Sequence, residues 1–158
     1  MSNDLACKDI QDVFEYIHIT IPVYYTQTFK TKADKTFLVG MNWYRTAHYF
    51  IKNEVKKWFT HDIVRQLTSQ QAATIKGPYE LAFEYYYKNK TSDLGNVCGI
   101  ASKHANDAFE AYGLVSNDNV QYCKKECYYV GGEDKENPRM EIYIRALPKE
   151  EDTDELHN

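Results

Sequence analysis

The sequence has no long apolar run, and this absence excludes a membrane-spanning helix. No stretch of its 158 residues approaches the roughly 18 consecutive apolar residues that cross a bilayer. Residues 1–12 are polar and acidic, which argues against a secretory signal peptide. We therefore expect a cytoplasmic protein that does not bind a membrane.

Cysteine, proline and glycine are also scarce, with 4, 4 and 7 copies. The four cysteines lack the paired spacing of a zinc site. The Gly131-Gly132 pair is expected in a hairpin turn rather than in a phosphate-binding loop, and no Ser-His-Asp nucleophile signature is present. Zinc sites, nucleotide-binding glycine loops and serine hydrolysis are therefore not expected.

Charge is distributed unevenly along the chain. The net charge is −4, but residues 1–15 carry −3 and residues 149–158 carry −4, which leaves +3 for residues 16–148. This pattern predicts an acidic N-terminal extension over 1–13, a single domain over 14–147 and an acidic, disordered tail over 148–158. A mildly basic domain permits a surface that binds phosphates.

Tyrosine is abundant, with 14 copies. Many of these tyrosines alternate with other residues in strand-like segments, which favours sheet faces and a dimer surface. The alternative is nucleic-acid binding, because tyrosine rings stack on bases and tyrosine hydroxyls bond phosphate oxygens.

Hydrophobic periodicity predicts an α+β domain. Alternation predicts strands over 13–24, 79–87, 120–130 and 139–147, with a short strand at 36–39. Three- and four-residue spacing predicts helices over 42–75 and 93–112, the second ending at Gly113. Residues 26–35 form a polar, lysine-rich loop or hairpin, and 131–138 form a turn. This order predicts a mixed β-sheet with two main helices.

Two acidic residues flank the second helix. Asp93 lies where a strand end meets the helix start, and Asp118 lies just past the helix end. Two carboxylates brought together in this way hold Mg²⁺, which prefers oxygen ligands. The alternative for Asp93 is a helix cap, and Asp107, four residues after Lys103, is typical of an ion pair on a helix surface.

The ordered motifs resemble those of the RusA-type Holliday-junction resolvases. These motifs are Asp-Leu-x-Asn, a helix, Asp-Ala-aromatic, Gly, Asn-Asp-Asn-Val, a strand, a glycine-containing hairpin and a last strand. The strand ending in Ile19 to Pro22, the basic loop and the helix with Tyr44-Arg45 precede them in the family's order. The resemblance spans roughly residues 14–147. Members are small homodimeric, Mg²⁺-dependent endonucleases of phages and prophages.

The resemblance implies a RusA-like fold, Mg²⁺ or Mn²⁺ as cofactor, and hydrolysis of branched DNA in recombination and repair. It implies that Asp93, Asp118 and Lys103 are catalytic and that both aspartates bind the metal. Asn96, Asn117 and Asp107 would support the site. The cations expected to meet DNA phosphates are Lys30, Lys32, Lys35, Arg45, Lys88 and Lys90.

One residue departs from the family's pattern. Gly95 occupies the position of the second aspartate, so two of three expected acids remain. Three interpretations stay open: Asp107 or another acid compensates, the chain is a binding-only or protein-interaction relative, or Gly95 alters an active parent. Loss of one carboxylate weakens Mg²⁺ binding.

Overall fold

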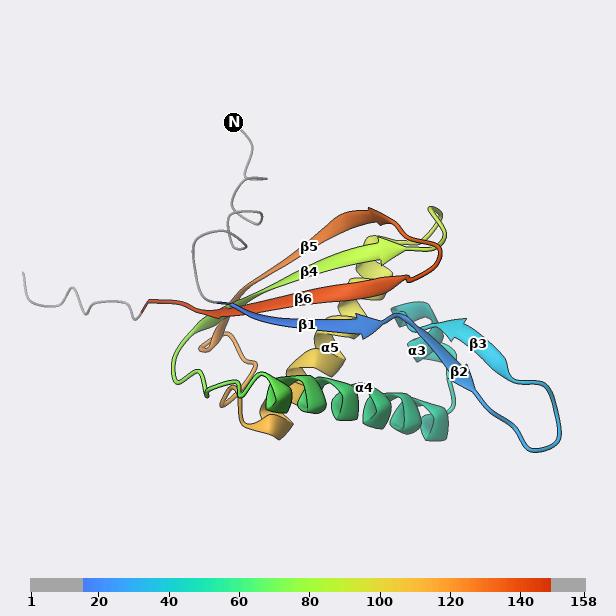
Figure 1. Cartoon of the computed structure of the whole chain (residues 1–158), viewed down its shortest axis with the longest axis horizontal. Coiled ribbons are helices and arrows are strands. Elements are labelled where there is room, and N and C mark those ends of the chain that lie inside the picture. The colour runs from blue at the N-terminus through green and yellow to red at the C-terminus, as the bar shows by residue number, and fades with distance from the viewer. Residues whose placement is uncertain (1–15, 149–158) are drawn as a thin grey trace, which may run out of the picture.

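The computed structural model describes residues 16–148 (Figure 1). The expected N-terminal extension, and the expected tail apart from Pro148, lie outside the described residues. A four-stranded sheet has the order β1-β6-β4-β5, in which β5 runs parallel to β4 and the other neighbours are antiparallel. The strands are β1 (Ile17–Pro22), β4 (Tyr79–Tyr87), β5 (Cys123–Glu133) and β6 (Arg139–Ala146). The predicted α+β class with a mixed sheet is confirmed.

The inner face of the sheet forms the core. Its alternating positions on the three strands β1, β4 and β6 are almost completely buried, namely Ile19, Ile21, Leu81, Phe83, Tyr85, Met140, Ile142 and Ile144. Helix α5 (Leu94–Tyr112) and helix α4 (Tyr49–Ser69) lie on this side of the sheet (Figure 1). The alternating apolar side chains of the strands therefore face the helices, as the sequence pattern predicts.

The other face of the sheet carries buried and half-buried ion pairs. Arg139 Nε lies 2.6 Å from Glu141 Oε1, and Arg139 Nη1 lies 2.8 Å from Asp134 Oδ2. Arg145 pairs with Glu80. Burying these charges is tolerated because each has an oppositely charged partner.

The first predicted helix is two helices. The structure has α3 (Met41–Thr46) and α4 instead of one helix over 42–75. Ala47 and His48 are extended between them, and His48 Nδ1 accepts a hydrogen bond from Phe50 N at 3.2 Å. This cap begins α4 at a new angle, and α4 ends at Ser69, just before Gln71 adopts a positive φ of 52°. No helix among residues 16–148 is long and apolar enough to cross a membrane.

The first predicted strand ends at Pro22 as β1. The segment expected to be a loop or hairpin over 26–35, with a short strand at 36–39, is a hairpin in which β2 (Tyr24–Gln27) pairs with β3 (Lys35–Leu38). The hairpin projects from one end of the long axis of the molecule (Figure 1). Strand β5 runs through Gly131 and Gly132, which were expected in a hairpin turn, and it pairs with β4 rather than with β6. A Cβ at Gly131 would lie 2.6 Å from the Tyr86 ring, so glycine lets the strand pass that side chain.

His104 is a buried polar residue in the middle of α5. It is 2% exposed, its ring stacks on Phe59 at 5.2 Å between centroids, and neither ring nitrogen has a hydrogen-bond partner within residues 16–148. Burial lowers the pKa of His104 to about 4; the nearby Asp107 opposes this shift, and Lys103 and Lys56 add to it. The imidazole is therefore neutral in the folded protein at neutral pH.

This histidine should make the protein acid-sensitive. Between about pH 6.5 and pH 4 the unfolded chain is protonated at His104, whereas the folded chain is not. The free energy of unfolding therefore falls as the pH drops through this range, by about 3 kcal/mol in total. His104→Leu should remove this loss. The unfolding free energy of the variant minus that of the parent, measured by urea titration, should therefore increase between pH 7 and pH 4.5. The exposed His61→Leu is the control, and equal growth for both variants would refute the assignment.

Candidate functional site

Asp93 caps α5. Its Oδ1 accepts a hydrogen bond from Asn96 N at 3.1 Å, and its extended backbone precedes the first helical residue, Leu94. The preceding residue, Ser92, instead accepts a hydrogen bond from Tyr85 OH at 3.2 Å. Asp93 nevertheless remains exposed, so the cap does not remove its carboxylate from solvent. The alternative interpretation as a cap is confirmed, and it is compatible with a second role.

Asn96 ties α5 to α3. Its Oδ1 accepts a hydrogen bond from Asn42 N at 2.8 Å, and a Cβ at Gly40 would lie only 2.5 Å from Asn96 Nδ2. Glycine at position 40 therefore permits this close approach. The contact encloses a small cleft of about 210 Å³, lined by Met41, Asn42, Arg45, Asp93, Gly95 and Asn96. The side-chain oxygen of Asn96 is thus engaged with the backbone of α3.

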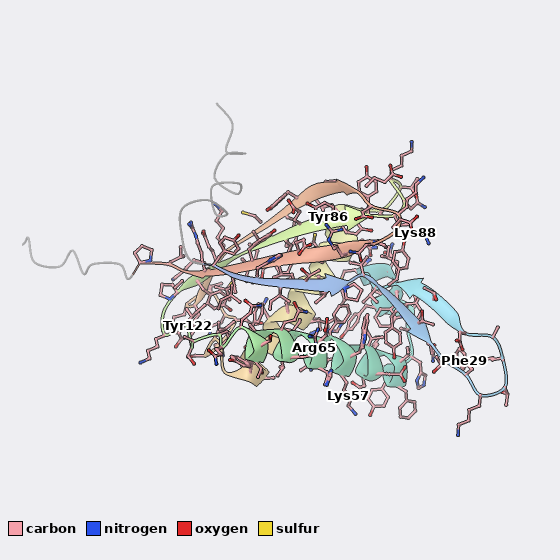
Figure 2. The ribbon with its side chains drawn as sticks, in the orientation of Figure 1. Phe29, Lys57, Arg65, Tyr86, Lys88 and Tyr122 are labelled. Carbon is pink, nitrogen blue, oxygen red and sulfur yellow. The ribbon has the colours of Figure 1, made fainter. Side chains whose placement is uncertain are left out.

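Asp118 lies at the opposite end of α5. It is exposed in a turn stabilised by Asn117 Oδ1, which accepts from Asn119 N at 2.9 Å. Asp118 lies near Cys123, the first residue of β5. Burial is the main cause that raises the pKa of Cys123 to about 11, and Glu126 and Asp118 add to this rise. Figure 2 shows Tyr122, four residues later, at one end of the molecule and Lys88 at the other.

The two aspartates of one chain therefore cannot share a metal ion. Helix α5 has 19 residues and is about 28 Å long at 1.5 Å per residue, with Asp93 before it and Asp118 after it. Within residues 16–148, no three His, Cys, Asp or Glu side chains are grouped as metal ligands. The expected pair does not fit Mg²⁺ within a single chain.

Lys103 and Asp107 lie between these ends. Lys103 is exposed on α5, about 15 Å along the helix from Asp93 at 1.5 Å per residue. Asp107 does not pair with Lys103; its Oδ2 lies 3.5 Å from Lys56 Nζ on α4. The expected ion pair on one helix is therefore replaced by one that joins two helices, and Asp107 does not compensate for Gly95 beside Asp93.

The expected DNA-binding cations gather at the Asp93 end. Lys30, Lys32 and Lys35 are exposed on the β2–β3 hairpin, and Lys88 and Lys90 follow β4. Figure 2 shows Phe29, on the hairpin, and Lys88 at this same end. Arg45 lines the small cleft that contains Asp93.

A larger cleft lies at the same end. It has a volume of about 570 Å³ and is lined by Tyr24, Lys88, Asn89, Lys90, Glu133 and Lys135. Lys88 Nζ lies 5.6 Å from the centroid of the Tyr24 ring, and Lys135 pairs with Glu133 at 3.3 Å. Lys135 was not identified from the sequence, although its place in the polar turn between β5 and β6 was a usable signal.

A further basic surface runs along α4. A groove of about 740 Å³ is lined by Asn53, Lys56, Lys57, Thr60, His61, Val64 and Arg65. Figure 2 shows Lys57 and Arg65 along this helix. Arg65 pairs with Asp62 at 2.6 Å, so part of its charge is balanced.

Comparisons with known proteins add no relative. No protein-family model matches the chain, and no curated protein matches it significantly. The resemblance to RusA-type resolvases thus rests on the residues quoted above.

Proposed function

We propose that this chain acts on branched DNA as a structure-specific endonuclease of the RusA type. The observation that carries the proposal is the convergence of three basic segments and Asp93 on one end of the molecule. The β2–β3 hairpin, the β4–α5 connection and the β5–β6 turn are far apart in sequence, and residues of all three line one cleft. Lysines on projecting loops bind DNA backbones without reading sequence, which suits recognition of a DNA shape.

Cleavage places a further demand on the assembly. Because Asp93 and Asp118 lie at opposite ends of α5, a site that uses both carboxylates needs one from each of two chains. A two-fold homodimer would form two such sites and would match the two-fold symmetry of a four-way junction. Asp93 of one chain and Asp118 of the other would hold Mg²⁺, which would supply polarisation of the scissile phosphate of the DNA and activation of a water.

The decisive test is cleavage of a synthetic four-way junction beside linear duplex, with Mg²⁺, Mn²⁺ or EDTA. Asp93→Asn is the informative variant, because asparagine is also a good helix cap and should preserve α5. We expect metal-dependent nicks in the junction that Asp93→Asn abolishes while binding persists. Full cleavage by this variant would refute the site.

Mixed dimers test whether the site is shared. Asp93→Asn and Asp118→Asn should each be inactive alone, but a mixture contains dimers in which the two substitutions fall in one site and leave the other intact. Recovered nicking on mixing would establish a shared site. No recovery, with both single variants inactive, would contradict it.

The second candidate is a binding-only member of the same type, either a DNA-binding module or a protein-interaction factor. Gly95 and the distance between Asp93 and Asp118 favour it. Tight junction binding without cleavage at any metal concentration would establish the DNA-binding form. A protein-interaction factor would show neither, and its weak DNA contacts would lack a steep salt dependence.

A further inference from the structure

The solvent-exposed side of α4 combines exposed aromatic rings with a basic groove, and no sequence motif indicates either feature. At its first turn Tyr49 and Phe50 are 64% and 71% exposed, although they are large and largely apolar. Their ring centroids lie 4.9 Å apart, and the His48 ring stacks on Phe50 at 5.1 Å with an interplanar angle of 25°. Three neighbouring rings are thus held at the surface with no covering element among residues 16–148.

The basic groove begins on the same side of this helix. Asn53 follows Tyr49 by four residues and Lys57 follows Phe50 by seven, and these spacings place side chains on one helix face. From Tyr49 to Arg65 the face is about 24 Å long at 1.5 Å per residue. The aromatic rings and the groove therefore form one continuous strip.

The charges of the strip favour a polyanion. Lys57 forms no ion pair with a described residue, whereas Lys56 is engaged with Asp107 and Arg65 with Asp62. His61 and Thr60 add hydrogen-bonding side chains between the cations, and Val64 contributes apolar surface. A groove of cations that tracks a backbone, beside aromatic rings for bases, is the arrangement by which proteins hold single strands without sequence preference.

We propose that this face of α4 binds a single nucleic-acid strand, with bases stacked on Tyr49 and Phe50 and phosphates along Lys57 and Arg65. Paired bases in a duplex do not expose their faces, so the ligand is an unpaired segment. The strip starts at Tyr49, four residues after Arg45 of the basic end, and runs along α4 away from that end (Figure 1). Binding of a strand along it does not depend on cleavage.

The test measures fluorescence anisotropy of an oligothymidine of about ten nucleotides bound to the full chain at several salt concentrations. Tyr49→Ala with Phe50→Ala should weaken binding about 10-fold or more, with an unchanged salt slope, because no phosphate contact is lost. Lys57→Gln with Arg65→Gln should instead reduce the salt slope by about 1.4, at about 0.7 per phosphate contact for single strands.

Val120→Ala with Val130→Ala is the matched control, because these side chains are 88% and 55% exposed outside α4. Binding equal to that of the parent in the aromatic variant, or no binding by the parent, would overturn the proposal. The proposal would also be overturned if sedimentation showed that the parent is a dimer and that only the aromatic substitutions dissociate it, since the face would then join two chains. Junction binding is scored separately, so this proposal fails or stands apart from the proposed function.

Discussion

Replacing Lys30, Lys88 and Lys90 with glutamine should weaken binding to a four-way junction by about two to three orders of magnitude at 0.1 M salt. Each lysine that neutralises a phosphate releases condensed counterions, and each lost contact lowers the slope of log affinity against log salt by about 0.9. The three substitutions should therefore reduce the slope by about 3. All three side chains are exposed, so the fold should be unaffected.

The far end of the molecule supplies a matched control. Lys76, Lys124 and Lys125 are also exposed, and they lie near the start of β4 and β5, beside the Asp118 end. Changing these three to glutamine alters the net charge equally, so a loss caused only by overall charge would appear in both variants. Equal losses would contradict a DNA surface at the Asp93 end. A loss confined to the first variant would place the surface there.

Local signals were sufficient for several elements. The bounds of β4 agree with prediction at Tyr79 and Tyr87, because a run rich in aromatic residues lies between Gly77-Pro78 and a polar segment. Helix α5 agrees because an acidic cap precedes its apolar stripe and Gly113, with a φ of 84°, ends it. Where clear capping residues, glycine or proline mark both ends of an element, the local sequence is sufficient to predict it.

Tertiary contacts decided the elements that were predicted wrongly. Helical spacing continues across Ala47 and His48, so nothing in the pattern marks the break between α3 and α4; the break is made by the His48 cap and by the contact of Asn42 with Asn96. Likewise, Gly131 is typical of a turn, but here it lets β5 pass the Tyr86 ring. The contacts of Asn42 with Asn96 and of Gly131 with Tyr86 join residues far apart in sequence, and local periodicity does not encode them.

The arrangement of the candidate site was predicted only in part. The basic segments were expected from the family resemblance, but their position together at the Asp93 end is visible only in the structure. The expectation that Asp93 and Asp118 meet within one chain was wrong. A helix of the predicted length already separates its two ends by more than 25 Å. His104 and the exposed rings of Tyr49 and Phe50 carry no motif, and only their three-dimensional surroundings distinguish them from ordinary helix residues.

Gly95→Asp should create a stronger metal site beside Asp93. A Cβ at Gly95 would meet only Asp93 Oδ1, at an ordinary 3.5 Å, and the residue has no positive φ, so a side chain fits without strain. The new carboxylate would enter the cleft that holds Asp93 and Arg45, in the first turn of α5, where the helix dipole favours negative charge. Two adjacent carboxylates are the arrangement that holds Mg²⁺ together with substrate phosphates.

We expect Gly95→Asp to raise Mg²⁺ affinity about 10- to 100-fold, the size of effect that even an outer partner of a metal site has. The readout is the thermal midpoint in Mg²⁺ against EDTA, because a ligand that binds only the folded state stabilises it. Gly95→Asn has the same shape without the charge and should show no Mg²⁺-dependent shift. If junction cleavage rises together with that shift in the aspartate variant alone, then the weak point of the native site is the missing carboxylate at position 95. If the shift appears but cleavage does not, a binding-only function is favoured, because a metal held at Asp93 would then be insufficient for hydrolysis.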